Sequence, residues 1–169
     1  MSALAEKSKK QIRIPDLLDY KRKGHKISMV TCYDYAFSRI IAETEIHMIL
    51  VGDSLGQVIL GYENTTEVSL DEMIHHCAAV KRGLGKQVLI CDMPFMTYQL
   101  GFEESMRNAA KIVQRGGAHG VKIEGANPNL YQLVSRLSDC GIPVMGHLGL
   151  TPQKIHSQGG YKVQGKEIE

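Results

Sequence analysis

Apolar runs of strand length recur along this chain, and each is followed by a polar residue that is able to do chemistry. The runs cover residues 48–52, 88–91, 121–123 and 142–146, and they lead into Asp53, Asp92, Glu124 and His147. Segments with helical periodicity lie between them. In a parallel sheet or barrel, the carboxyl ends of all strands fall on one face, where ligands bind. The pattern therefore predicts three carboxylates at one rim, a hard oxygen-ligand site for a divalent cation.

The local signals predict five strands separated by capped helices. The strands are expected at residues 27–32, 48–51, 87–91, 120–123 and 142–145. Helix starts are indicated by Asp34, by the Ser69 and Glu72 capping box, and by Asn127 followed by proline. A further helix is expected to end at residues 116–117. Residues 56–66 are typical of a rim loop, with a small hairpin as one alternative.

Hydrophobic spacing also predicts which helix faces are buried. The residues expected to face inward in three of the helices are Leu17, Leu18 and Tyr20; Phe37, Ile40 and Ile41; and Met106, Ala109, Ala110 and Val113. Residues 149–169 are rich in glycine and polar residues and give no strong indication of a helix or strand.

The alternation predicts an α/β fold with a parallel sheet covered by helices. An open doubly wound sheet and a (β/α)8 barrel are the two candidates. Chemically capable residues at the tips of several successive strands favour the barrel, because an open sheet concentrates its site at one switch point. We expect residues 1–13 to be a flexible tail and residues 14–169 to form about the first five βα units of a (β/α)8 barrel.

Composition excludes several classes of function. A formal net charge of +2 over 169 residues predicts no nucleic-acid partner and no membrane attraction. No apolar stretch approaches the roughly 20 residues that span a bilayer. The four cysteines form no CxxC pair and are expected to be small buried hydrophobes. We therefore expect a cytoplasmic protein.

The residues at the predicted rim suggest specific roles. Asp53, Asp92 and Glu124 suit Mg²⁺, which prefers oxygen ligands. Lys122 lies two residues before Glu124, so both side chains point to one side of the strand. An anionic ligand would stabilise this buried ammonium group, and an ion pair with Glu124 is the alternative. His147 is expected either to contact substrate or to be structural.

Neighbouring histidines elsewhere in the chain do not form a metal motif. His75 and His76 are adjacent on a predicted helix, where successive side chains diverge by about 100 degrees. They are therefore expected at the surface or at an interface.

Six ordered motifs resemble one enzyme family, ketopantoate hydroxymethyltransferase (3-methyl-2-oxobutanoate hydroxymethyltransferase). The motifs are TCYDY at residues 31–35, LVGDSLG at 50–56, CDMPFM at 91–96, VKIEG at 121–125, GHLGLTPQ at 146–153 and GGYKVQG at 159–165. The resemblance extends from about residue 14 to residue 165, which is nearly the whole chain.

The resemblance implies a (β/α)8 barrel that binds Mg²⁺ through Asp53, Asp92 and Glu124. The ion would chelate the keto and carboxylate oxygens of 3-methyl-2-oxobutanoate, and Asp53, Ser54 and Lys122 would hold the carboxylate, with Asp92 and His147 as further substrate contacts. A base would remove the proton next to the ketone. The resulting enolate would attack the methylene group of the co-substrate 5,10-methylenetetrahydrofolate. Ketopantoate would form, as the first committed step of pantothenate biosynthesis, and family members form homo-oligomers.

The resemblance also implies that the general-base glutamate lies on a later strand, beyond Glu169. No residue of this chain is therefore expected to be the catalytic base, and activity of the chain alone should fall by about 10²–10⁴ or more. Two other interpretations stay open. One is a non-catalytic metal-binding remnant that assembles with other subunits. The other is a different Mg²⁺-dependent enzyme acting on 2-oxo acids, of the phosphoenolpyruvate mutase and isocitrate lyase kind.

Overall fold

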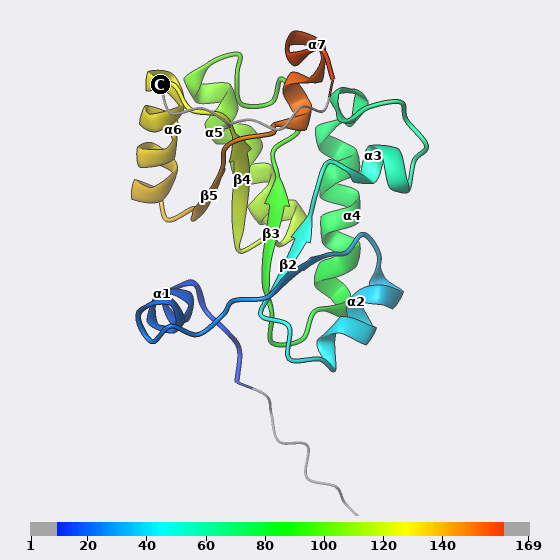
Figure 1. Ribbon diagram of the computed structural model, residues 1–169, viewed down its shortest axis with the longest axis vertical. Helices are drawn as coiled ribbons and strands as arrows, with labels where there is room; N and C mark the ends of the chain where they lie inside the picture. Colours follow the sequence, from blue (N-terminus) through cyan, green and yellow to red (C-terminus); the bar gives the residue numbers. More distant parts are fainter. Residues whose placement is uncertain (1–9, 161–169) are drawn as a thin grey trace, which may run out of the picture.

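The strand order of the sheet decides between the two candidate architectures. The computed structural model describes residues 10–160, and five parallel strands lie in it in the order β1-β2-β3-β4-β5 (Figure 1). The strands are β1 (Met29–Thr31), β2 (Met48–Val51), β3 (Val88–Asp92), β4 (Gly120–Glu124) and β5 (Val144–His147). A doubly wound sheet would reverse its order at a switch point. The unbroken order is that of five successive βα units of a (β/α)8 barrel, as predicted.

Seven α-helices and three 3₁₀- or π-helical turns flank the strands within the described residues. The α-helices are α1 (Ile14–Arg22), α2 (Tyr35–Ala42), α3 (Leu55–Val58), α4 (Leu70–Gly83), α5 (Phe102–Lys111), α6 (Pro128–Asp139) and α7 (Ile155–Gln158). The turns are η1 (Thr65–Glu67), η2 (Ile112–Gly116) and η3 (Pro152–Lys154). None of the helices in this part of the chain is long and apolar enough to cross a bilayer.

The predicted helix caps are confirmed. Asp34 accepts a hydrogen bond from the N–H three residues further on, at 2.8 Å, and Asn127 does the same at 3.0 Å. Ser69 and Glu72 bind each other's backbone N–H groups, so both members of the capping box are engaged. Each cap satisfies donors that the first turn of a helix leaves without partners. The sequence therefore fixes where α2, α4 and α6 begin.

Alternate residues of the strands divide between the two faces of the sheet. One set packs against the helices and includes Ile49, Val51, Leu89, Cys91, Val121 and Ile123, with Met73, Ile74, Cys77 and Val80 of α4 in the same core. The other set packs on the opposite face, which α1 covers near the amino ends of the strands. That set comprises Met48, Leu50, Val88 and Ile90, together with Ile12 and, partly buried, Leu17, Tyr20 and Met145.

The same alternation places Asp92, Lys122, Glu124 and His147 on the face opposite the helices. In the register of the sheet, Asp92 lies beside Lys122 and Glu124 lies beside His147. Asp92 follows Val88 and Ile90 by even steps along β3, so it shares their face. Within a barrel this face is the interior, and its carboxyl end is the usual position of an active site.

Two of the predicted inward positions of α2 are wrong. Phe37 and Ile40 are each 63% exposed, whereas Ser38 and Ala42 are buried. The reason is close packing of small residues between α2 and α4. A Cβ added at Gly83 would lie 2.8 Å from the Cβ of Ser38, whose hydroxyl also donates to a backbone carbonyl of α4 at 2.7 Å. Small residues thus decide which face of α2 is buried.

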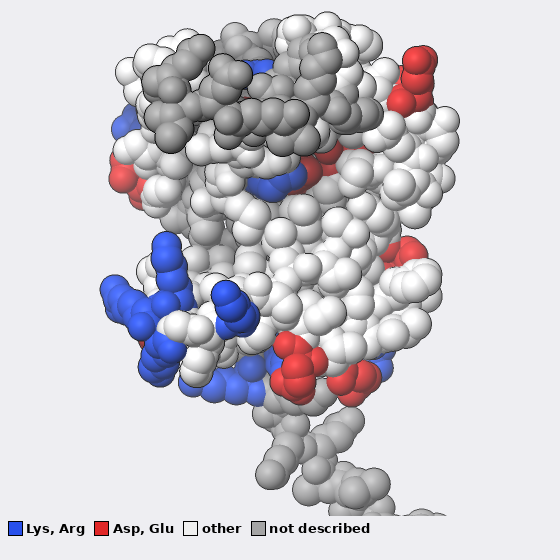
Figure 2. All heavy atoms as spheres, in the orientation of Figure 1, with Lys and Arg blue, Asp and Glu red and all other residues white. Residues whose placement is uncertain are grey.

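The amino-terminal boundary also needs correction. Ile12 is buried, and its N–H donates to the carbonyl of Lys86 at 2.8 Å, so the predicted tail, residues 1–13, contacts the core at Ile12. The rest of that predicted tail, residues 1–9, lies outside the described residues. On α1, Leu17 packs inward as expected, but Leu18 is 56% exposed. Basic side chains gather over α1 on the face that Figure 2 shows.

Three further expectations differ from the structure. Residues 59–64 form the predicted loop between α3 and η1, and the alternative of a hairpin is wrong. Ile112 rather than Val113 is fully buried, because the π-helical turn η2 shifts the spacing that follows α5. Cys140 is exposed at the end of α6, whereas the other three cysteines are buried and free, as predicted.

Candidate functional site at the carboxyl ends of the strands

Asp92 is the centre of one polar cluster. The ammonium group of Lys122 lies 2.5 Å from Asp92 Oδ2, and the backbone N–H of Asp53 donates to the same oxygen at 3.1 Å. The alternative ion pair between Lys122 and Glu124 is therefore wrong, because the register of the sheet places Lys122 beside Asp92. A Cβ added at Gly52 would lie 3.1 Å from the Ser54 hydroxyl. The small residue at position 52 thus leaves room for the Ser54 hydroxyl to lie close to the backbone of Gly52.

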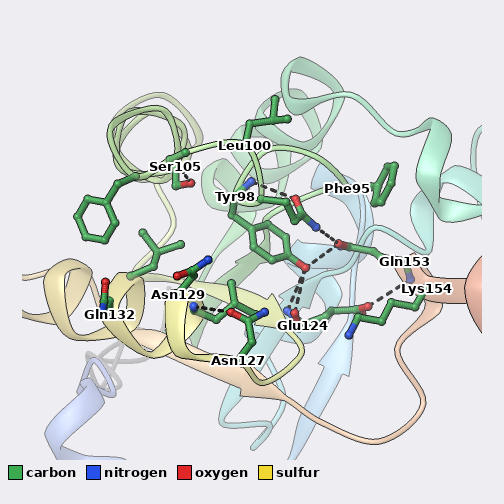
Figure 3. A pocket seen from close by; sticks show the side chains of 15 residues that line it. Phe95, Tyr98, Leu100, Ser105, Glu124, Asn127, Asn129, Gln132, Gln153 and Lys154 are labelled. Carbon is green, nitrogen blue, oxygen red and sulfur yellow. Dashed lines mark hydrogen bonds between the residues drawn. The ribbon is translucent and has the colours of Figure 1, made fainter.

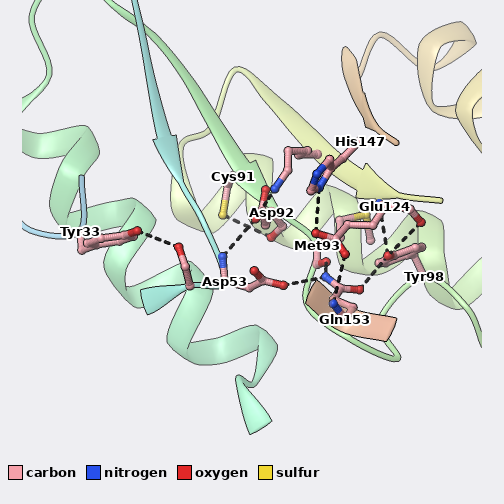
Figure 4. Close-up of polar contacts among 11 residues, drawn as sticks. Tyr33, Asp53, Cys91, Asp92, Met93, Tyr98, Glu124, His147 and Gln153 are labelled. Atoms are coloured by element: carbon pink, nitrogen blue, oxygen red, sulfur yellow. Dashed lines mark hydrogen bonds and ion pairs between the residues drawn. The ribbon is translucent and has the colours of Figure 1, made fainter. Parts of the chain in front are cut away.

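Glu124 is the centre of a second cluster, joined to the first through Gln153. His147 Nδ1 lies 2.9 Å from Glu124 Oε1, and the backbone N–H of Gln153 donates to Oε2 at 3.2 Å. The side chain of Gln153 donates to Asp53 Oδ2 at 2.8 Å. Figure 4 shows these contacts, with Asp53 on one side of the Gln153 amide and Glu124 on the other. The structure thus links all three predicted acids in one network.

Ser54 lies beside the network rather than within it. Its hydroxyl is 2.8 Å from the hydroxyl of Tyr33, which comes from the segment after β1 (Figure 4). Of the two histidines assigned to the surface, His75 is exposed, but His76 Nδ1 lies 2.7 Å from the carbonyl oxygen of Tyr33. His76 therefore supports the loop that carries Tyr33.

Burial changes the acidity of all three carboxyl groups. Burial first, and then the charge of Asp92, raise the pKa of Asp53 to about 6. Burial also raises the pKa of Asp92, although Lys122 acts in the opposite direction. The pKa of Glu124 is raised by burial and by the charge of Asp53. Three buried carboxyl groups that repel one another are stabilised by a bound cation.

The free energy of unfolding should reflect the raised pKa of Asp53. In metal-free buffer, the stability of Asp53→Asn relative to wild type should increase by about 2 kcal/mol between pH 4 and pH 7. The folded protein holds the Asp53 proton more tightly than the unfolded chain does, so wild type loses stability as the pH rises from about 4 to about 6. Urea unfolding at several pH values measures the difference, with the exposed Asp139→Asn as control. A difference that did not change with pH would contradict the expectation.

The donor set fits a divalent cation at the two aspartates. Asp92 Oδ1 is buried and has no hydrogen-bond partner among the described residues. An orphaned, buried carboxylate oxygen is costly unless a ligand completes it. Both oxygens of Glu124, in contrast, already have protein partners. Between residues 10 and 160, no three His, Cys, Asp or Glu side chains converge closely enough to form a complete cage.

Two buried residues of this site had no assigned role in the sequence analysis. Gln153 belongs to the GHLGLTPQ motif, and Tyr98 follows the CDMPFM motif by two residues. The Tyr98 hydroxyl donates to Gln153 Oε1 at 2.7 Å and lies 3.3 Å from the backbone N and O of Glu124. Gln153 could have been identified from the sequence, because it is a polar residue within a family motif. No pattern in the sequence indicated Tyr98.

A cavity of about 530 Å³ adjoins the network on the side of α5 and α6 (Figure 3). Tyr98, Glu124 and Gln153 line it together with aromatic and amide side chains, including Phe95 and Asn129. Its volume is in the usual range for small-molecule pockets. These three residues, Tyr98, Glu124 and Gln153, therefore belong both to the carboxylate network and to the lining of the cavity.

Comparison with known proteins decides the family. A family model described as ketopantoate hydroxymethyltransferase matches residues 11–169. The chain belongs to this family. Curated relatives named 3-methyl-2-oxobutanoate hydroxymethyltransferase match the chain closely. The one from Thermoanaerobacter sp. (strain X514) is 50% identical over 90% of this chain and 56% of the relative. The one from Koribacter versatilis is 54% identical over 90% of this chain and 51% of the relative. A third, from Bdellovibrio bacteriovorus, is 54% identical over 91% and 58%.

Solved structures agree with the family assignment at the level of the fold. Phosphoenolpyruvate phosphomutase from Streptomyces platensis subsp. rosaceus matches with a TM-score of 0.62 at 11% identity, over 80% of this chain and 53% of that one. A 2,3-dimethylmalate lyase matches with a TM-score of 0.58 at 13% identity, over 78% and 51%. The described part of this chain thus shares its fold with about half of each of these two proteins. The present chain spans about half the length of the curated relatives it matches.

Proposed function

We propose that this chain serves in the Mg²⁺-dependent transfer of a hydroxymethyl group from 5,10-methylenetetrahydrofolate to 3-methyl-2-oxobutanoate. The product is ketopantoate, and the step is the first committed one of pantothenate biosynthesis. The observation that carries the proposal is the buried Asp92 Oδ1, which has no hydrogen-bond partner in the described part of the chain and lies beside the Lys122 cation. The chain that holds it belongs to the hydroxymethyltransferase family. The proposal includes a cytoplasmic homo-oligomer without nucleic-acid or membrane partners.

Asp53 and Asp92 are the residues proposed to hold Mg²⁺. Both are buried at neighbouring strand tips, and hard oxygen donors suit this ion. Bound there, Mg²⁺ would supply Lewis-acid polarisation of the substrate's keto group. The two side-chain oxygens of Glu124 contact His147 and the backbone N–H of Gln153. We therefore propose that Glu124 contributes less to binding of the metal ion than the two aspartates do.

Lys122 and Ser54 are proposed to bind the carboxylate of the 2-oxo acid. The Lys122 side chain is 11% exposed, so its charge acts where water screens it little. Ser54 offers a hydroxyl next to Asp53, and His147 offers a ring nitrogen at the end of β5. These groups would orient the substrate so that its keto oxygen faces the two aspartates. No residue of the described chain is assigned as the base that removes the proton.

Proton exchange at C3 of 3-methyl-2-oxobutanoate tests the proposal. In D₂O, nuclear magnetic resonance should show Mg²⁺-dependent loss of the C3 proton signal that is slow, because no described residue is assigned as the base, but faster than in a protein-free control. Added 5,10-methylenetetrahydrofolate should then yield ketopantoate. Mg²⁺ binding without exchange would instead support a non-catalytic metal-binding protein. Exchange without hydroxymethyl transfer would support another 2-oxo acid enzyme and overturn the assigned reaction.

A further inference from the structure

Gln153 is a buried amide whose hydrogen-bonding groups are all used. It lies on η3, after β5, and is 4% exposed. Its Nε2 donates to Asp53 Oδ2 at 2.8 Å and to the carbonyl oxygen of Met93 at 3.0 Å. Its Oε1 accepts from the Tyr98 hydroxyl at 2.7 Å, and its backbone N–H donates to Glu124. Segments that are far apart in the sequence therefore meet at one side chain.

The surroundings fix which end of the amide faces Asp53. A carboxylate and a backbone carbonyl can only accept hydrogen bonds from it, so the NH₂ group must face them. The Tyr98 hydroxyl lies at the other end and donates to Oε1. A flipped amide would place its oxygen against two acceptors. The network thus permits a single orientation, in which Asp53 always receives a neutral donor.

A neutral donor suits a site that collects carboxylates for a cation. A lysine or arginine at position 153 would compete with the cation for Asp53, and a glutamate would add to the repulsion among three buried acids. The amide holds one oxygen of Asp53 without changing the charge of the site. Partners of this kind orient metal-binding carboxylates, and their loss typically costs about 10- to 100-fold in metal affinity.

We propose that Gln153 is a positioning residue that sets the orientation of Asp53 and ties it to Glu124 across the rim. The proposal rests on the proposed function, because the site that Gln153 organises is the Mg²⁺ site of that reaction. Gln153 acts through its side-chain N–H groups on Asp53 and through its backbone N–H on Glu124. Only the first of these is lost when the side chain is replaced.

Calorimetric titration with Mg²⁺ tests the role of Gln153 without any measurement of activity. Gln153→Met, which keeps the length but removes the amide, should weaken Mg²⁺ binding by about 10- to 100-fold. Gln132→Met is the matched control, because Gln132 is an exposed glutamine that lines the neighbouring cavity. Its affinity should equal that of wild type. Circular dichroism confirms that each variant is folded at the temperature of the titration.

Tyr98→Phe keeps the test decisive if Gln153→Met does not fold. It removes the hydroxyl that donates to Gln153 Oε1 and helps to hold the amide, and it leaves Gln153 in place, so it should weaken Mg²⁺ binding by at least about threefold. Unchanged affinity in the folded variants would overturn the positioning role while the proposed function stood. Failure of wild type to bind Mg²⁺ would overturn the proposed function and this inference with it.

Discussion

Replacing Lys122 with methionine should lower the free energy of unfolding by about 3–5 kcal/mol in metal-free buffer at pH 7.5. The side chains of Lys122 and Asp92 are only 11% and 3% exposed, so their charges are largely removed from water. Loss of the ammonium group leaves a buried carboxylate with the Asp53 N–H at 3.1 Å as its remaining hydrogen-bond donor. Urea unfolding followed by circular dichroism measures the effect.

Two comparisons separate the ion pair from lost packing. In the double variant Lys122→Met/Asp92→Asn no charge is left unpaired, so it should recover part of the loss. Lys86→Met is the matched control. Its side chain is also 11% exposed, but its partner Glu45 is 84% exposed, and such pairs contribute about 1 kcal/mol or less. If Lys122→Met lowered the free energy of unfolding by no more than Lys86→Met does, the buried pair of Lys122 and Asp92 would not stabilise the fold as expected.

Replacing Asp92 with asparagine should weaken Mg²⁺ binding by at least about 100-fold. Asparagine keeps the shape of the side chain but removes the charge and replaces one of the two carboxylate oxygens. Loss of a residue that only orients a metal ligand typically weakens metal binding by about 10- to 100-fold, so loss of a direct ligand should weaken it more. Asp92 contributes the unpartnered buried oxygen, which makes it the member of the acidic network that most needs a cation.

Calorimetric titration of folded Asp92→Asn with Mg²⁺ measures this effect, and proton exchange at C3 of 3-methyl-2-oxobutanoate should be lost with it. Asp139→Asn, which alters an exposed acid at the end of α6, is the control and should titrate like wild type. An Asp92→Asn affinity within about threefold of wild type would show that the ion binds elsewhere.

Local rules accounted for much of the fold. Caps at Asp34, Ser69 and Asn127 depend on residues close in sequence, and the structure has all three helices beginning there. The strand β2 has the predicted limits, and the other four deviate by one or two residues at one or both ends. Which face of α2 is buried could not be predicted, because it depends on Gly83 of a helix that lies far along the chain.

The sequence by itself determined that Asp53, Asp92, Glu124 and His147 would lie at the carboxyl ends of parallel strands. Alternation along β3 and β4 then requires Asp92, Lys122 and Glu124 to share one face, because side chains repeat every two residues in a strand. Only the tertiary structure decided which partners these groups take. Lys122 pairs with Asp92 through the register between strands, and Gln153 reaches Asp53 across 100 residues of sequence. Such contacts depend on how separate segments fold together in space, which no local pattern records.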